Sequence, residues 1–228
     1  GSNQKSGCQE ARVYEIGNKF IPKDLPLTEY PDERETICIG IWGKEENFFT
    51  LKGLVDTVAE TLFIDFEYVE DKKTFLHPYR TAKILYNGEE IGYLGQLTYE
   101  IQKEEDMRES AYIAEIDLKA LRPVYGKVPT FAPISKFAKE TRDLALVMNK
   151  SVTCGEVEKA IAEASSFVES VELFDVYEGL QVGPEKKSMA FTVTFAPKEE
   201  EFTTEAVDGY VKKILKNLNN KLGVELRS

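Results

Sequence analysis

The chain has 228 residues, of which 42% are hydrophobic, so it can bury a sizeable core in one or two domains. Its 40 acidic residues outnumber its 29 basic residues, and the formal net charge of −11 disfavours nonspecific binding to DNA or RNA because phosphate binding requires a surplus of Lys and Arg. No apolar run is long enough to span a membrane, and the 3 cysteines are too far apart to indicate a disulfide framework or a zinc site, so we expect a cytoplasmic protein.

The first half of the chain begins with the pattern of two strands and a helix. Residues 13–16 and 36–42 have high β propensity and predict two strands, both of them buried. Between residues 47 and 62 the apolar residues recur at helical spacing over about four turns. We therefore expect an amphipathic helix after the second strand.

A hairpin and a connector follow in the sequence. Asn87 and Gly88 separate two apolar runs and predict a type I′ turn, because both central residues of that turn take positive φ. A further apolar strand is expected at residues 111–116, which completes an antiparallel α/β module. Residues 121–133 then contain three prolines without a steady apolar period, which is typical of a connector between domains.

The second half of the chain predicts the ferredoxin-like order βαββαβ. The first helix has a capping-box pattern at Thr153 and Glu156, and Gly223 is in the usual position for the end of the last helix. The fold class is therefore α+β. The expected elements are strands at 143–148, 171–177, 188–195 and 224–227, with helices at 153–165 and 204–222.

Two helices can cover only one face of this four-stranded sheet, so the other face is expected to be open. The alternation of side chains places Phe174 and Val176 in the core, and Leu173 on the opposite side. A small polar surface with one aromatic ring suits unstacked bases, whereas the same alternation is also typical of the solvated side of any two-layer sheet. The residues expected on the open face are Asp143, Asp175, Tyr177, Ser188, Thr192 and Thr194.

Several strings in the second half resemble a known family. ISKFAKETRDLALVM, VESVELFDVYEG, KKSMAFTVTF and GVELR are similar to the ferredoxin-fold anticodon-binding domain that ends the bacterial phenylalanyl-tRNA synthetase beta subunit. Upstream, VYEIGNKF, FFTLKGLVD, FLHPYRTAKI and IGYLGQL resemble the preceding catalytic-like module, which has a class II synthetase-like fold. The resemblance implies a truncated catalytic-like module at 1–122, a linker at 123–133 and the anticodon-binding domain at 134–228.

The family implies a function in ATP-dependent aminoacylation. We expect a noncatalytic scaffold that binds an alpha subunit within an (αβ)₂ heterotetramer and holds the anticodon region of tRNA(Phe), with no DNA or membrane partner. Catalysis, ATP and Mg²⁺ belong to the complete enzyme, and no cofactor is expected in this fragment. Tyr177 is expected to stack on a base and Asp175 to read a base edge. The other expected RNA-binding residues are Arg142, Lys136, Lys139, Ser188 and Thr192.

The sequence departs from the family at Ala138, at Tyr79 and in the acidic run 199–201, which weakens phosphate contact there. His77 precedes Pro78 and has no evident catalytic partner, so a structural role at a turn is favoured. No metal site is expected, because the carboxylates of Glu15, Asp24, Glu29 and Asp32 are dispersed.

Two other functions were compared with this one. A ferredoxin-like domain that senses a small molecule is the alternative, but it needs a glycine-rich turn after the first strand, where the sequence offers only Gly155. A third possibility is that the first half is an enzyme on its own. It lacks arginines in the expected strand context for binding ATP.

Overall fold

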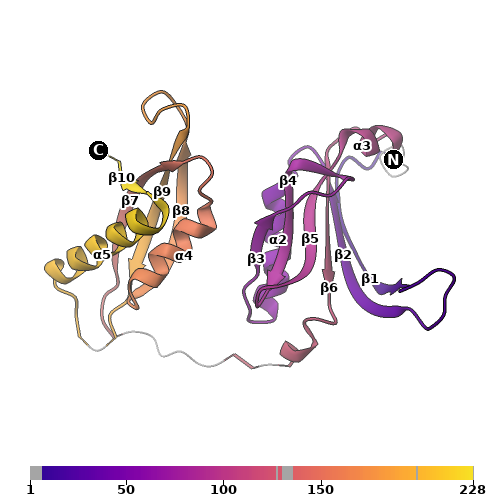
Figure 1. Ribbon diagram of the computed structural model, residues 1–228, viewed down its shortest axis with the longest axis horizontal. Helices are drawn as coiled ribbons and strands as arrows, with labels where there is room; N and C mark the ends of the chain where they lie inside the picture. Colours follow the sequence, from indigo (N-terminus) through magenta and orange to yellow (C-terminus); the bar gives the residue numbers. More distant parts are fainter. Residues whose placement is uncertain (1–6, 127, 130–135, 199, 228) are drawn as a thin grey trace. The chain divides into compact units, whose positions relative to one another are not determined.

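The computed structural model describes residues 7–126, 128–129, 136–198 and 200–227 (Figure 1). The chain divides into two compact units, Gly1–Thr130 and Phe131–Ser228, which are described separately below. Part of the linker predicted at 123–133 lies outside the described residues. Its first part belongs to a short 3-10 helix, η1 (Arg122–Val124), whose Val124 is buried in the core of the first unit.

The first unit is a six-stranded antiparallel sheet with one long helix on it (Figure 1). Helix α2 (Phe48–Thr61) packs on the central strands β5 and β6, and its buried side chains Leu51 and Val55 meet Ile41 and Leu94 of the sheet. The strands run in the order β1-β2-β6-β5-β4-β3. They are β1 (Ala11–Ile21), β2 (Asp32–Trp42), β3 (Glu67–Glu70), β4 (Leu76–Tyr86), β5 (Glu89–Leu97) and β6 (Ala111–Asp117).

Local sequence features explain the start of α2 and the β4–β5 turn. The Asn47 side chain caps α2 by accepting hydrogen bonds from the backbone N–H groups of Phe49 and Thr50. The β4–β5 hairpin turns at Asn87 and Gly88, with φ values of 51° and 80°, which confirms the predicted turn. Strand β3 and the short helix α3 (Tyr99–Glu104) were not predicted, because each is too short to show a period.

The expectation that the first strand is buried was wrong. Val13 and Ile16 in β1 are 50% and 53% exposed, whereas Ile39 and Ile41 of the neighbouring β2 are buried. β1 is an edge strand of the sheet, and α2 packs mainly on the central strands β5 and β6. High β propensity therefore identified the strand but could not indicate what packs on it.

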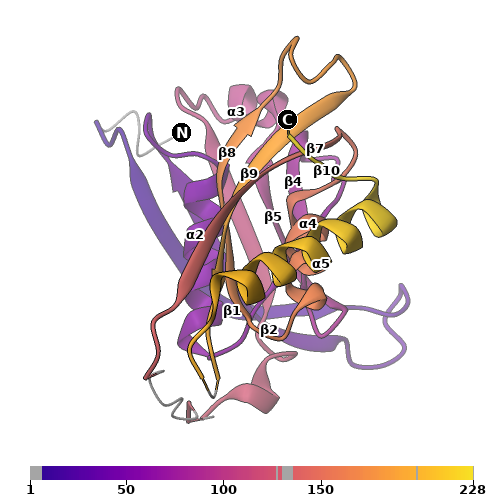
Figure 2. The same cartoon turned by 90° about the vertical axis from the view of Figure 1, so that its left-hand side faces the viewer.

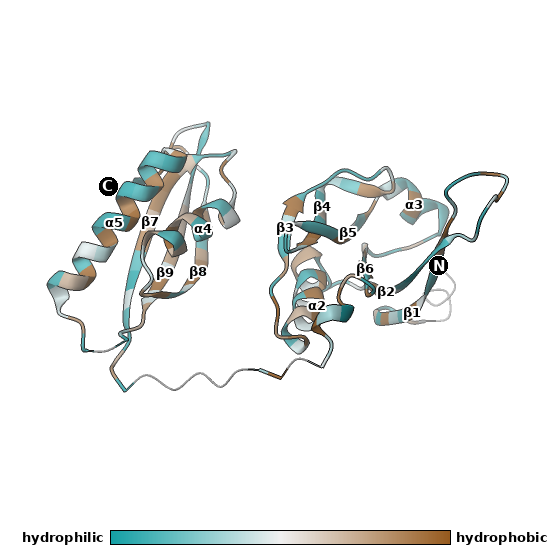
Figure 3. Cartoon of the chain, turned by 60° about the horizontal axis from the view of Figure 1, so that its bottom comes forward, coloured by the Kyte–Doolittle hydropathy of each residue, from teal (hydrophilic) through white to brown (hydrophobic). Residues whose placement is uncertain are grey.

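The second unit has the predicted ferredoxin-like order and an antiparallel sheet arranged β10-β7-β9-β8. Figure 2 shows both helices on one side of this sheet. Along α5, hydrophilic and hydrophobic residues alternate in the way that a half-buried helix requires (Figure 3). The elements are β7 (Glu140–Asn149), α4 (Cys154–Ala164), β8 (Val168–Tyr177), β9 (Lys186–Phe195), α5 (Thr204–Leu222) and β10 (Glu225–Leu226).

The core of this unit lies between the helices and the side of the sheet that carries Leu144, Leu146, Met148 and Phe191. These side chains alternate with outward residues, as the period of two predicts. At its C-terminal end, α5 is capped by Gly223 with a left-handed φ of 64°.

Strand β8 does not follow the predicted alternation. Leu173 pairs with the core residue Phe191, and Asp175 pairs with the next residue of β9, Ala190, so Phe174 is the extra residue of a β-bulge. Phe174 and Val176 are 59% and 51% exposed, which corrects their assignment to the core. The bulge shifts the face of every residue before it, and β8 is an edge strand that the helices cover incompletely.

The capping box of α4 gives a local stability test. The Glu156 N–H donates to Thr153 Oγ1 at 3.3 Å, and the Thr153 N–H donates to Glu156 Oε2 at 2.8 Å. We expect Thr153→Ala to cost about 1 kcal/mol of local helix stability, and Thr153→Ser to cost little because it keeps the accepting oxygen. Hydrogen exchange of the first-turn amides of α4 in the whole chain measures this. Equal exchange rates in wild type and Thr153→Ala would contradict it.

Candidate functional site

The open face of the second sheet is its side away from α4 and α5 (Figures 1 and 2). Strand register brings polar side chains there into rows, because Asp143 pairs with Thr192 and Tyr177 pairs with Ser188. The Thr192 hydroxyl donates to Asp143 Oδ1 at 2.7 Å. Asp175 lies on β8 and its side chain is exposed. The structure therefore brings four of the predicted residues, Asp175, Tyr177, Ser188 and Thr192, to one face.

Ser188 is on the predicted face but is only 3% exposed, which corrects the expectation that its hydroxyl is open to a ligand. It lies on β9, which is hydrogen-bonded to strands on both sides, and its direct neighbours are Val147 and the half-buried Tyr177. In this conformation a contact between Ser188 and a ligand would require its neighbours to move.

Tyr177 is held by a residue that the sequence reasoning did not select. The Arg227 guanidinium lies over the Tyr177 ring, with 5.1 Å from Cζ to the ring centroid, which is a cation–π distance. Arg227 Nη2 also donates to Gln181 Oε1 at 2.9 Å, and the Arg227 N–H donates to the Ala145 carbonyl at 2.8 Å. The sequence marks Arg227 only as a cation at the end of the last predicted strand, 224–227.

Arg142, one of the cations predicted to contact RNA, does not project from the open face. Arg142 pairs with the core residue Val193, so it projects from the side opposite to Tyr177, and its Nη1 lies 3.0 Å from Glu140 Oε2. Although Arg142 directly precedes Asp143 in the sequence, strand alternation therefore keeps it off the open face.

The two predicted lysines precede the sheet. Lys139 Nζ forms an ion pair with Glu169 Oε2 at 2.5 Å, whereas Lys136 has an exposed side chain. The charge of Lys139 is thus already partnered in the free chain. Exposed ion pairs of this kind contribute little to stability, but they reduce the positive potential that the cation presents to an anion.

The open face carries more negative than positive charge. Exposed carboxylates come from β7, β8 and β10, whereas Arg227 is a cation of this face held in place by other side chains. Such a surface repels phosphates, but its carboxylates can accept hydrogen bonds from the amino groups of bases. The acidic residues of this face are Asp143, Glu172, Asp175 and Glu225.

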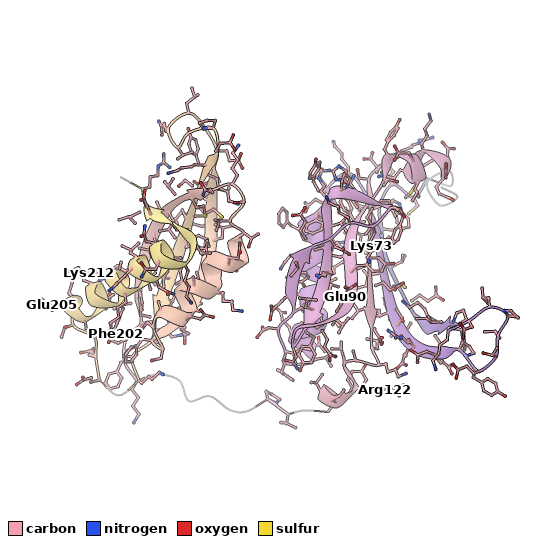
Figure 4. The ribbon with its side chains drawn as sticks, in the orientation of Figure 1. Lys73, Glu90, Arg122, Phe202, Glu205 and Lys212 are labelled. Carbon is pink, nitrogen blue, oxygen red and sulfur yellow. The ribbon has the colours of Figure 1, made fainter. Side chains whose placement is uncertain are left out.

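In the first unit, several polar side chains on the sheet face away from α2 contact one another. Lys19 is ion-paired with Glu115, and the same carboxylate accepts a hydrogen bond from the Tyr93 hydroxyl at 3.4 Å. Burial and the Glu115 charge raise the pKa of Tyr93 to about 12. Lys73 lies 3.2 Å from Asp71 and 4.0 Å from Glu90, and Figure 4 labels Lys73 and Glu90 on this unit.

His77 and Asp32, two further candidates for chemistry, have structural partners. His77 Nδ1 accepts a hydrogen bond from the Tyr79 N–H at 3.2 Å, within the irregular part of β4. Asp32 lies 2.7 Å from Arg34 and 2.9 Å from Lys119, and the hydrogen bond from Arg34 is the main cause that lowers its pKa. Among the described residues, no three His, Cys, Asp or Glu side chains gather as a metal site would require.

Among the hollows lined by described residues are two that do not include Asp175 or Tyr177. One, of about 310 Å³, is lined by Asn149, Lys150, Ser151 and Glu185, and the other, of about 340 Å³, surrounds α3. In the described part of the chain, no helix is long and apolar enough to cross a membrane.

Comparison with known proteins shows which families the two parts of the chain resemble. Residues 1–118 match the family model of the phenylalanyl-tRNA synthetase beta chain CLM domain, and residues 135–227 match that of the ferredoxin-fold anticodon binding domain. The pyrrolysyl-tRNA synthetase structure from Desulfitobacterium hafniense covers 53% of this chain and 43% of its own, with 17% identity and a TM-score of 0.42.

Curated relatives match nearly the whole chain. The phenylalanine–tRNA ligase beta subunits of Bacillus subtilis (strain 168) and Streptococcus pyogenes serotype M18 are each 35% identical to it over 94% of its length. The chain spans only 28% of the length of each of these relatives. Because the first family model covers residues 1–118 of 228, the chain belongs to the phenylalanyl-tRNA synthetase beta chain family.

Proposed function

We propose that this chain is a noncatalytic part of a phenylalanine–tRNA ligase and that its open face binds the anticodon region of tRNA(Phe). The match of residues 135–227 to an anticodon-binding domain is the observation that carries this proposal. The open face supports it, because it offers the Tyr177 ring and exposed carboxylates on a rigid sheet. Sequence-specific recognition of RNA generally uses unpaired loop bases in this way.

Each residue has a role that its contacts suit. Tyr177 stacks on an unpaired base, and Arg227 holds the ring from one side. Asp175 accepts a hydrogen bond from a base edge, since an exposed carboxylate is an acceptor only. Thr192 and Asp143, already joined by a hydrogen bond, form a second polar contact. Lys136 supplies a phosphate contact near the start of β7.

The first unit acts as a scaffold for an alpha subunit in a cytoplasmic (αβ)₂ ligase that uses ATP and Mg²⁺. The relatives' designation as beta subunits supports a partner chain. The ion pairs that occupy the sheet face away from α2 support a noncatalytic role, because cations such as Lys19 and Lys73 are already paired with carboxylates.

Tyr177→Ala in the full beta subunit, assembled with its alpha subunit, is expected to raise the KM for tRNA(Phe) between about 5-fold and 150-fold. This range corresponds to the roughly 1–3 kcal/mol that one stacked base contributes. Tyr177→Phe keeps the ring and is expected to keep the KM within about 2-fold of wild type. The rate of ATP–pyrophosphate exchange serves as the control and should not change. An unaltered KM in Tyr177→Ala means that this face does not hold the anticodon.

Lys139 and Arg142, which are ion-paired, are expected to matter less than Lys136, which has no ion pair within the described part of the chain. In the same assembled enzyme, Lys136→Ala should lower the slope of log KM against log salt by about 1, as for one lost phosphate contact. Lys139→Ala and Arg142→Ala should leave this slope unchanged, because Glu169 and Glu140 already neutralise those charges. Equal effects of all three substitutions would refute the distinction.

The chain alone is expected to give no phenylalanine-dependent ATP–pyrophosphate exchange. The physical reason is that the first unit is proposed to be a scaffold, and that Lys19 and Lys73 on its sheet are already paired with carboxylates. The measurement uses the purified chain without an alpha subunit, with the complete enzyme as the positive control. Exchange above background by the chain alone contradicts the scaffold role.

A further inference from the structure

Gly179 lies against the hydroxyl end of the Tyr177 ring. A Cβ atom added at Gly179 would come within 2.7 Å of Tyr177 Cζ and 3.2 Å of Cε1, and it would be closer still to the hydroxyl oxygen. Real Cβ atoms do not approach other heavy atoms to 2.7 Å, so the ring or the loop would have to move.

The backbone at this position does not require glycine. Gly179 is not among the residues with positive φ, whereas Gly183 in the same β8–β9 loop has a φ of 91°. An alanine could therefore adopt the conformation of residue 179 if the Tyr177 ring were not there. The constraint is the close approach of one side chain and not the shape of the loop.

The same loop also holds the ring from another direction. Gln181 accepts the hydrogen bond from Arg227, and the Arg227 guanidinium lies over the Tyr177 ring. The Val182 N–H donates to the Gly179 carbonyl at 3.1 Å, which fixes the turn between these two contacts. Residues 179–182 therefore bound the hydroxyl end of the ring and anchor the cation on its face.

We propose that Gly179 is a positioning residue for RNA binding, which sets the orientation of the Tyr177 ring by leaving space for its hydroxyl end. This inference rests on the proposed function, because it takes Tyr177 to be the stacking residue. A ring fixed before binding loses little freedom when a base stacks on it, and a rotated ring presents the base with the wrong plane.

Gly179→Ala in the assembled ligase tests the inference. The KM for tRNA(Phe) should rise by at least about 3-fold, towards the rise that Tyr177→Ala gives, because a displaced ring loses part of its stacking. The rate of ATP–pyrophosphate exchange should not change. Gly209→Ala is the matched control, since Gly209 has no heavy atom within 4 Å of an added Cβ and lies within α5. It should leave the KM for tRNA unchanged.

The double variant Tyr177→Ala/Gly179→Ala separates positioning from a general effect on folding. Without the ring, the added methyl group has space, so the double variant should bind tRNA and unfold like Tyr177→Ala alone. A further loss in the double variant, or no loss in Gly179→Ala when Tyr177→Ala is impaired, overturns the inference. If Tyr177→Ala itself retains the wild-type KM, the proposed function fails instead.

Discussion

The pairing of β9 with both of its neighbours is the constraint on which the second unit depends. β9 pairs with β7 from Lys186 to Phe195 and with β8 along most of the same length. This register places Phe191 and Phe195 in the core and Thr192 on the open face. Since side chains alternate along a strand, a shift of one residue would reverse both faces together. The core and the candidate site are thus two results of one register.

The sequence predicted which apolar side chains are buried in the central strands, but not which are buried in the edge strands β1 and β8. The alternation in 143–148 and 188–195 predicted strands that are held on both sides, and their buried apolar residues are those expected. In contrast, β1 and β8 are edge strands, and their apolar residues Ile16 and Phe174 are exposed. Alternation reports a buried face only where another element covers it, and the bulge at Phe174 has no sequence signal such as glycine.

The sequence likewise predicted only part of the candidate site. Asp175 and Tyr177 lie after the bulge, so their common face followed correctly from a period of two. The contact of Arg227 with Tyr177 joins residues 50 positions apart and depends on the pairing of β10 with β7, which no local pattern encodes. The burial of Ser188 likewise depends on which side chains lie beside it across two strand pairs.

Charge limits how the open face can contribute to the proposed RNA binding. With a net charge of −11 and carboxylates along the open face, the chain gains little from displacing counterions on phosphates. Its contribution is therefore expected from stacking and from hydrogen bonds to bases, which depend on orientation more than on charge. In the proposed complex, most of the attraction for the phosphate backbone then comes from surfaces other than this face. A weakly attracting but rigid face discriminates among bases well, because a wrong base has no strong electrostatic attraction to compensate for lost contacts.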